Sequence, residues 1–492
     1  MNYSFIFRLL SFVAGALMMT FLLCAGIAVV HLAEPGEGDA LWAFLWSGLV
    51  AFAVGLVLHQ LGRGAGTKVF RKEALALVGL SWILASLLGT IPYLLGIPGI
   101  AFADAFFESA SGITTTGSSV LSDLEELPFS LLFWRQISQW MGGMGVIVFF
   151  VAILGHLGVG AKMLFTNEST ARAADFDQGR VQSGVKRLFL LYLGLTILCF
   201  GSLLATGLGW FEAIAHTFTT VATGGYSTRT GGISDLANPA AEWVMIGFMI
   251  LGSVSFFFLV SLVRQRWTEA WNFTEVKIYL GLLFFATVAV FLSLSVAGLP
   301  FDSYEHQLRA ATFQVVSLAS TCGYATEDYN AWPVFTHGLL LFLMLVGGCS
   351  GSTAGGLKVV RLLVGFKIIL NSLEKSYRSH VVRPVIVNGR PLDANYRDDV
   401  LVYIVILIFI VIFSVLVVSL VEPSLGLEGV LSAVIATLFN IGPGFGEVGP
   451  TETFSHLSGF TKIYLSILMV IGRIELFAIL VLFTPSLWKR FH

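Results

Sequence analysis

Long uninterrupted apolar segments dominate the sequence. The hydrocarbon layer of a membrane is about 30 Å thick, and a helix of about 20 apolar residues crosses it. Because a main chain surrounded by lipid must satisfy its own hydrogen bonds, such segments form helices. Only 12% of the 492 residues are charged, about half the share found in soluble domains. Ten segments are predicted to span the membrane: 5–30, 41–61, 75–96, 131–154, 188–208, 242–263, 277–298, 336–370, 399–421 and 462–485.

The distribution of charge predicts the topology. Lysine and arginine accumulate in cytoplasmic loops. With both termini inside, most of the 28 lysines and arginines fall on the cytoplasmic side, and most of the 30 acidic residues fall outside. Arg135 is one of the few cations that this arrangement assigns to the outside. The segment 5–30 is too long for the core of a signal peptide, so we expect it to be the first transmembrane helix and both termini to be cytoplasmic.

Several other classes of protein lack support in the sequence. No long basic stripe or known module indicates nucleic-acid binding. The four cysteines stand without paired spacing, which argues against a zinc site and a disulfide framework. An intramembrane enzyme would need clustered His, Asp or Glu ligands, or a nucleophile beside a base. The apolar segments contain no such group, so no catalytic residue is predicted.

Four of the predicted external connections share one pattern. Each begins with an apolar segment too short to span and then becomes polar and glycine-bearing: FADAFFESASGITTTGSS, FEAIAHTFTTVATGGYSTR, QLRAATFQVVSLASTCGYATED and EGVLSAVIATLFNIGPGFGEVGP. Aligning their glycines at 117, 224, 323 and 442 gives four pseudo-repeated units of helix, short helix, glycine segment and helix. We predict an all-α polytopic membrane protein whose four units surround one central pore. The predicted boundaries are a two-helix extension at 1–70 and units at 71–160, 161–270, 271–395 and 396–492.

The glycine segments are suited to line a pore for a cation. Main-chain carbonyls replace the water shell of a monovalent cation without adding a fixed charge. A short helix that ends at mid-membrane directs its partial negative charge toward the pore axis, and glycine permits the backbone angles that turn successive carbonyls inward. The alternative is that these segments are glycine-rich turns that only stabilise a helix bundle. That alternative accounts for one such segment more readily than for four.

The sequence resembles the Trk/Ktr/HKT superfamily of potassium transporters in four glycine segments: TTTGSS, ATGGYST, STCGYAT and NIGPGFGEVGP. The two additional N-terminal helices and the segment GGCSGSTAGGLKVVR resemble its TrkH branch. The resemblance covers almost the whole chain. It implies potassium uptake across the bacterial inner membrane and a homodimer with one pore per subunit. It also implies a cytoplasmic ring of nucleotide-binding TrkA-type subunits that regulates transport.

The resemblance assigns three residues of each segment to a selectivity filter for potassium: Thr115, Thr116 and Gly117; Ala222, Thr223 and Gly224; Thr321, Cys322 and Gly323; Asn440, Ile441 and Gly442. A glycine in all four segments implies potassium rather than sodium. The four segments differ from one another, so weaker discrimination against sodium is expected. For Cys322 we favour the carbonyl as the ligand, with an incidental thiol, over a redox role.

Two features of the sequence are candidate gating elements. Arg473 lies inside the tenth apolar segment, where a charge costs roughly 2.5–3.5 kcal/mol on insertion scales. The resemblance implies that it projects into the pore as an electrostatic barrier; the alternative is a buried ion pair with Glu475. The eighth apolar segment is interrupted by five glycines, which favour local unwinding: Gly347, Gly348, Gly351, Gly355 and Gly356. The resemblance implies a mobile intramembrane loop that blocks the pathway; the alternative is a passive kink.

The remaining polar groups have more ordinary interpretations. Gly351–Gly356 followed by Lys358 is similar to a phosphate-binding loop, but the lysine is one place late and no Ser or Thr follows, so no nucleotide binding by this chain is predicted. Glu108 and His216 on the short helices are expected to pack and hydrogen-bond behind the filter rather than bind ions.

Few ionisable groups lie in the middle of the predicted spans, so few residues could form a proton relay. A proton- or sodium-coupled potassium symporter nevertheless remains the alternative to a channel-like transporter. One group of acidic residues is expected at the external entrance, where together they would concentrate cations; the alternative for each residue singly is an ordinary solvated rim. The group is Asp123, Glu125, Glu126, Glu327, Asp328 and Glu447.

Overall fold

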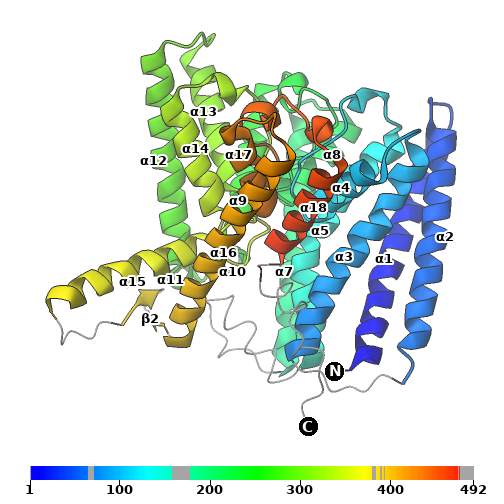
Figure 1. The fold of residues 1–492 in the computed structure, drawn as a ribbon, viewed down its shortest axis with the longest axis horizontal. Coiled ribbons are helices and arrows are strands. Elements are labelled where there is room, and N and C mark those ends of the chain that lie inside the picture. Colours follow the sequence, from blue (N-terminus) through cyan, green and yellow to red (C-terminus); the bar gives the residue numbers. More distant parts are fainter. Residues whose placement is uncertain are drawn as a thin grey trace.

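The structure is a computed structural model that describes residues 2–64, 71–157, 178–378, 384–387, 390–392, 394–474 and 476. Its described part consists of helices and one small antiparallel hairpin, β1 (Ile386–Val387) and β2 (Arg390–Pro391). Glu475 and the end of the tenth predicted span lie outside the described residues. The long helices are α1 (Tyr3–Val30), α2 (Glu37–Leu61), α3 (Arg71–Gly96), α5 (Phe129–Leu157), α7 (Gln178–Ala205), α12 (Thr274–Ala297) and α16 (Ala394–Val421), which mostly run alongside one another (Figure 1).

Six described helices are long and apolar enough to cross a membrane: Tyr3–Val30, Glu37–Leu61, Leu75–Gly96, Lys186–Ala205, Thr274–Ala297 and Tyr396–Val421. A seventh span results if α9 (Pro239–Ser253) and α10 (Phe256–Val263) are counted together, although they are bent by 102°. These helices establish a multi-pass membrane protein. The predicted total of ten spans stays a prediction.

The order of long helix, short helix and further helix occurs four times along the described chain. The short helices follow α3, α7, α12 and α16, and they are α4 (Phe102–Ile113), α8 (Trp210–Val221), α13 (Tyr304–Ala319) and α17 (Leu427–Leu438). The helices that follow them are α5, α9, α14 (Val334–Val346) and α18 (Gly459–Arg473). Each short helix is therefore followed by a non-helical segment that leads into the next helix.

The eighth predicted span, 336–370, is divided into two helices with different directions. The helix α14 ends at Val346, and α15 begins only at Val359 and continues to Tyr377. In Figure 1, α15 extends sideways from the bundle rather than continuing along α14. Apolar composition predicted the helical character of this segment, but it did not predict the change in direction after the glycines.

Local sequence explains where several helices begin and end. The side chain of Asn238 accepts a hydrogen bond from the Ala241 N–H and precedes a proline at the first position of α9, a favourable helix start. The side chains of Ser303 and Ser458 cap α13 and α18 in the same way. The helix α12 stops at Gly298, whose φ of 65° lies in the left-handed region that glycine tolerates.

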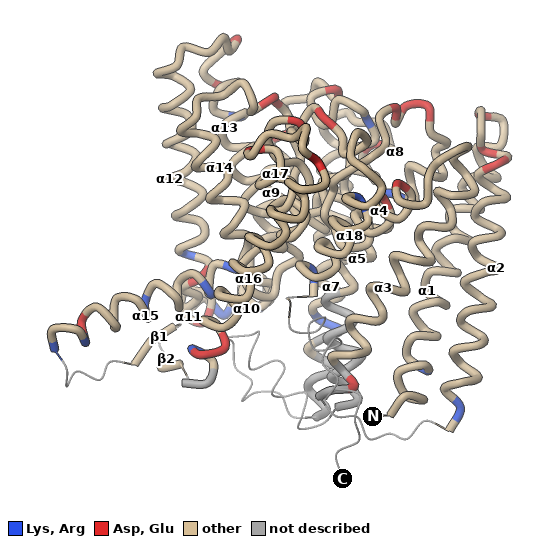
Figure 2. Tube along the Cα trace, in the orientation of Figure 1, with Lys and Arg blue, Asp and Glu red and all other residues tan. Residues whose placement is uncertain are grey.

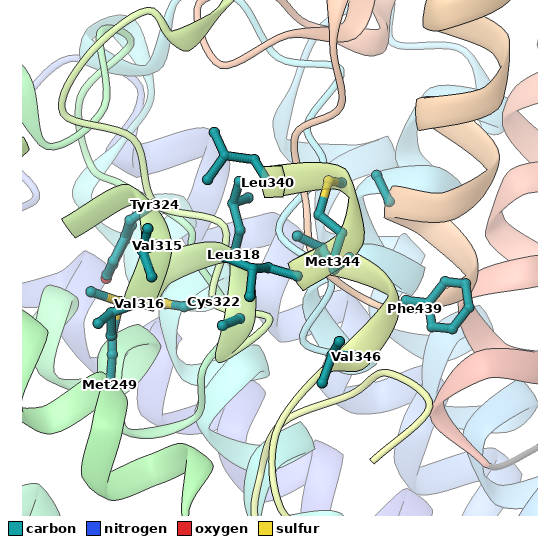
Figure 3. Close-up of a cluster of buried hydrophobic side chains, with 14 of the residues drawn as sticks. Met249, Val315, Val316, Leu318, Cys322, Tyr324, Leu340, Met344, Val346 and Phe439 are labelled. Carbon is teal, nitrogen blue, oxygen red and sulfur yellow. The ribbon is translucent and has the colours of Figure 1, made fainter. Parts of the chain in front are cut away.

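Apolar side chains fix the short helices in the bundle. Figure 3 shows one part of this core, in which Val316 and Leu318 of α13 lie among residues such as Met249 of α9 and Met344 of α14. Such tightly packed interiors do not deform continuously. The core therefore holds the C-terminal end of each short helix, and the segment that follows it, in one position.

Charged residues separate along the bundle axis. Figure 2 shows acidic residues gathered on the connections at the upper end, whereas Lys and Arg are more frequent at the lower end, near α11 (Trp267–Trp271) and α15. The charge pattern used to predict the topology therefore corresponds to two different ends of the folded chain.

Candidate ion pathway

The four segments after the short helices share one backbone conformation. Near its start, each segment has one non-glycine residue with a positive φ. These residues are Thr115 (55°), Thr223 (51°), Thr321 (56°) and Asn440 (55°). The next N–H in each segment donates to the carbonyl five residues earlier: Thr116 to Ser111, Gly224 to Thr219, Cys322 to Ser317 and Ile441 to Ala436. This is a helix ending in which glycine is usual. A non-glycine residue there costs roughly 1–2 kcal/mol, so the surrounding structure enforces the conformation four times.

The shared conformation also fixes which residues correspond. Two residues after each of these positions stands a glycine with positive φ: Gly117 (89°), Gly225 (80°), Gly323 (81°) and Gly442 (111°). The sequence alignment of the second segment on Gly224 was therefore wrong by one residue. Ala222 is the C-cap residue that follows α8, and the triplet equivalent to the other three is Thr223, Gly224 and Gly225. We name residues 114–117, 222–225, 320–323 and 439–442 the four convergent segments.

The four convergent segments form a closed ring. A Cβ atom on Gly117 would overlap the carbonyl oxygen of Gly224, one on Gly225 would overlap that of Cys322, and one on Gly323 would overlap that of Ile441. The ring closes because a Cβ on Gly442 would lie 3.0 Å from the carbonyl oxygen of Thr116. Each glycine is thus needed for close approach to the next segment. The carbonyls of equivalent residues from four distant parts of the chain therefore each lie against the next segment of the ring.

Side chains join neighbouring segments behind the ring. The hydroxyl of Tyr226 donates to the Glu108 carbonyl at 2.9 Å, and that of Tyr324 hydrogen-bonds with Thr219 of the preceding unit. Ser118 donates to the Gly442 carbonyl at 2.7 Å, which connects the first segment to the fourth. These contacts run between units rather than within one unit. They hold the segments at fixed spacing.

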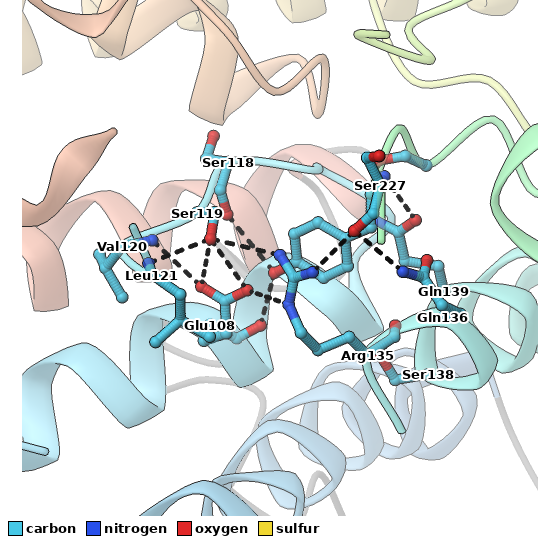
Figure 4. Close-up of polar contacts among 12 residues, drawn as sticks. Glu108, Ser118, Ser119, Val120, Leu121, Arg135, Gln136, Ser138, Gln139 and Ser227 are labelled. Atoms are coloured by element: carbon cyan, nitrogen blue, oxygen red, sulfur yellow. Dashed lines mark hydrogen bonds and ion pairs between the residues drawn. The ribbon is translucent and has the colours of Figure 1, made fainter. Parts of the chain in front are cut away.

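A buried ion pair supports the first two segments. Arg135 of α5 and Glu108 of α4 are almost completely buried, and Arg135 Nε donates to Glu108 Oε1 at 2.8 Å (Figure 4). Glu108 also accepts a hydrogen bond from Val120 N–H, and Arg135 donates Nη1 to the Ser227 carbonyl at 3.0 Å. Glu108 thus has the supporting role expected from the sequence. The topology prediction assigned Arg135 to the outside and did not identify its role as a support, because counting the charges in loops does not reveal which residues pair in the protein interior.

Other polar groups that contact the second segment or its short helix are also part of the support. His216 is buried, with Nδ1 2.8 Å from the Glu212 carbonyl oxygen and Nε2 3.3 Å from the Ser227 hydroxyl. Gln139 donates Nε2 to the Gly224 carbonyl at 2.7 Å and accepts a hydrogen bond from the Tyr226 N–H. The second segment is therefore held from α5 as well as from its own short helix.

The side chain of Cys322 is packed in the protein interior. Figure 3 shows its side chain in the apolar cluster beside Val316, and the residue is fully buried. All four cysteines are free and buried, and the described residues contain no group of three or more His, Cys, Asp or Glu that could hold a metal ion. The position of Cys322 in the ring therefore rests on its carbonyl.

The interruption of the eighth span lies directly against the convergent segments. We name residues 347–358 the glycine loop. The Gly355 N–H donates to the Thr321 hydroxyl at 2.6 Å, and Thr223 donates its hydroxyl to that of Thr353 at 3.2 Å. A Cβ on Gly355 would overlap the Phe439 carbonyl of the fourth segment. The loop thus contacts three of the four segments, on the side of their positive-φ residues.

Arg473 joins the glycine loop to the first unit. It is the last residue of α18 and is 7% exposed. Its Nη1 donates to the Thr353 carbonyl at 2.7 Å, and its Nη2 donates to the Gly142 carbonyl of α5 at 3.4 Å. The two gating elements expected from the sequence are therefore in direct contact.

The acidic residues that follow the convergent segments lie mostly in solvent. Asp123, Glu125, Glu126, Asp328 and Glu447 are exposed, and Glu327 is half-buried. Partial burial raises the pKa of Glu125, but hydrogen bonds from the Thr230 hydroxyl and N–H outweigh it and leave the pKa below its ordinary value. This carboxylate therefore stays charged near neutral pH.

We expect Arg135→Gln to destabilise the protein by about 3–5 kcal/mol, because it leaves the buried Glu108 carboxylate without its partner. Thermal unfolding in detergent measures the change. Arg229→Gln is the matched control, because Arg229 pairs with Glu212 at the surface with 45% of its side chain exposed, and such pairs contribute at most about 1 kcal/mol. Equal melting temperatures for both variants would contradict the supporting role of Arg135.

Comparison with known proteins agrees with this architecture. Residues 42–490 match the TrkH family, described as cation transport protein. The chain is 33% identical to the Trk system potassium uptake protein TrkH of Salmonella typhimurium and to that of Escherichia coli K12, over 98% of this chain and all of each relative. It superposes on the crystal structure of the potassium transporter TrkH from Vibrio parahaemolyticus with a TM-score of 0.88 and 30% identity, covering 99% of this chain and 100% of that chain. The chain therefore belongs to the TrkH family of cation transport proteins, a family of transporters rather than enzymes.

Proposed function

We propose that the chain takes up potassium across the bacterial inner membrane through a pore formed by one polypeptide. The closed ring of glycine contacts carries this proposal, because it brings one carbonyl from each segment to a common level: Thr116, Gly224, Cys322 and Ile441. Carbonyl oxygens in such a ring replace the hydration shell of a monovalent cation. The corrected filter comprises Thr115–Gly117, Thr223–Gly225, Thr321–Gly323 and Asn440–Gly442.

The glycine loop and Arg473 form the gate in this proposal. The loop contacts the threonine and asparagine ends of the filter segments, and the Arg473 guanidinium binds the loop at Thr353. A cation that leaves the filter would therefore meet both a physical obstruction and a fixed positive charge. Transport requires the loop to move aside.

The assembly follows the family. We propose a homodimer with one pore in each subunit, both termini in the cytoplasm, and regulation by cytoplasmic nucleotide-binding subunits of the TrkA type. The relatives are named as proteins of a Trk system, which supports a transporter with more than one component. Potassium is the transported ion, and no nucleotide site is assigned to this chain.

Rubidium uptake into proteoliposomes tests the transport mode. We expect purified protein to admit labelled rubidium down its own gradient at the same rate with and without an imposed pH or sodium gradient. Uptake that requires either gradient would instead identify a coupled symporter. No uptake under any condition, by the folded wild-type protein and by folded Arg473→Ala alike, would refute the proposed pore.

Gly225→Ala tests the filter and its register. The added Cβ would overlap the Cys322 carbonyl, so we expect uptake to fall and the preference for rubidium over sodium to be lost. Gly247→Ala is the matched control in α9, because nothing lies within 4 Å of a Cβ there. Competition of sodium with labelled rubidium measures both variants. Wild-type selectivity of Gly225→Ala would exclude Gly225 from the filter.

Arg473→Ala tests the electrostatic barrier. Removing the guanidinium eliminates its charge and its hydrogen bond to the Thr353 carbonyl, so we expect cation flux to rise. A tenfold rise would correspond to a barrier of about 1.4 kcal/mol. Rubidium flux through the folded variant is the measurement, and an unchanged or lower flux would contradict the barrier.

A further inference from the structure

A buried carboxylate lies beneath the glycine loop. Glu275 is in the first turn of α12 and is only 2% exposed. No residue of the convergent segments touches its carboxylate among the hydrogen bonds of the described chain. A buried carboxylate is costly unless hydrogen bonds and opposite charge compensate it, so its partners identify what it stabilises.

Glu275 binds the two ends of the glycine loop at once. Its Oε1 accepts a hydrogen bond from the Ser350 N–H at 2.7 Å, near the start of the loop, and one from the Val360 N–H at 3.2 Å, just beyond its end. Val360 is in the first turn of α15, where free N–H groups and the helix dipole favour an anion. Hydrogen bonds to an ionised acceptor are stronger than neutral ones. One carboxylate oxygen thus closes the base of the loop.

The closed loop contains backbone strain that these bonds offset. Lys358, at the end of the loop, has a φ of 72°, a left-handed conformation that is unfavourable for a residue with a side chain. Its Nζ donates to the Ala354 carbonyl at 2.8 Å, and its charge interacts favourably with Glu275. Strained conformations persist only where the surrounding structure fixes them. Releasing Glu275 would therefore free the loop to relax.

One turn later, α12 is linked to the loop through Ser253 of α9. The Tyr279 hydroxyl donates to the Ser253 hydroxyl at 2.9 Å, and the Ser253 carbonyl accepts a hydrogen bond from the Cys349 N–H at 2.8 Å. The N-terminal part of α12 therefore supports the loop from below at two levels. Of these two connections, the one made by Glu275 holds both ends of the loop.

We propose that Glu275 is a positioning residue that latches the glycine loop in its closed position. This inference rests on the proposed role of the loop as the gate. The simpler alternative is that Glu275 only stabilises the start of α15. The two differ in what happens to the loop itself when the carboxylate is neutralised.

Cys349 provides a native reporter of the loop. It is fully buried in the closed conformation, so a charged methanethiosulfonate reagent should modify it only when the loop opens. In Glu275→Gln we expect Cys349 to be modified roughly tenfold faster, because the two hydrogen bonds from the loop are then made to a neutral acceptor and lose their charge assistance. Mass spectrometry of the modified full-length protein identifies the cysteine, and Cys349→Ser in the same background should abolish the gain.

Glu37→Gln is the matched control. Glu37 is also a buried carboxylate in the first turn of a helix, but it accepts hydrogen bonds from the Ser130 N–H and hydroxyl at the start of α5. The Glu37→Gln substitution should leave the modification rate of Cys349 unchanged. Glu275→Asp provides a second variant that retains the charge but shortens the side chain, and we expect a smaller increase.

Rubidium flux measured on the same variants separates the two proposals. Faster modification of Cys349 together with higher flux supports both the latch and the gate. Faster modification with unchanged flux supports the latch but contradicts the loop as the gate. A wild-type modification rate in both folded Glu275 variants, or an equal increase in Glu37→Gln, would overturn the latch.

Discussion

Close contact between glycine Cα atoms and the carbonyl oxygens of neighbouring segments is the constraint on which the architecture depends. Such contact tolerates no side chain at Gly117, Gly225 or Gly323, and it requires four helix ends to stop at one level. The repeated hydrogen bond to the carbonyl five residues earlier sets each helix end. The surrounding helices then serve mainly to hold four strained turns at the spacing that the ring demands.

The supports behind the ring differ from unit to unit. The buried pair of Glu108 and Arg135 lies in the first unit, and Arg135 reaches the second unit at the Ser227 carbonyl. Tyr226 and Tyr324 each reach back to the preceding unit. On the opposite side, the glycine loop comes from the third unit alone. A ring with approximate fourfold geometry is therefore supported asymmetrically, and the candidate gate acts on it from the third and fourth units, through the glycine loop and Arg473.

Much of the fold could be predicted from the sequence, because a segment of about 20 apolar residues in lipid must satisfy its own backbone hydrogen bonds and therefore forms a helix. The register of the second segment was not, because Gly224 and Gly225 are adjacent and only backbone angles distinguish them. Nor were Arg135 and Glu275 predictable as supports. An arginine and a glutamate near the ends of apolar segments are typical of membrane boundaries, and their partners come from distant parts of the chain.

The four ring carbonyls belong to Thr116, Gly224, Cys322 and Ile441, four different residue types within one polypeptide. In a channel assembled from identical subunits, every substitution appears in all quadrants together. Here a mutation alters one quadrant and leaves three intact. In the proposed filter, single substitutions can therefore adjust ion preference in small increments, one quadrant at a time.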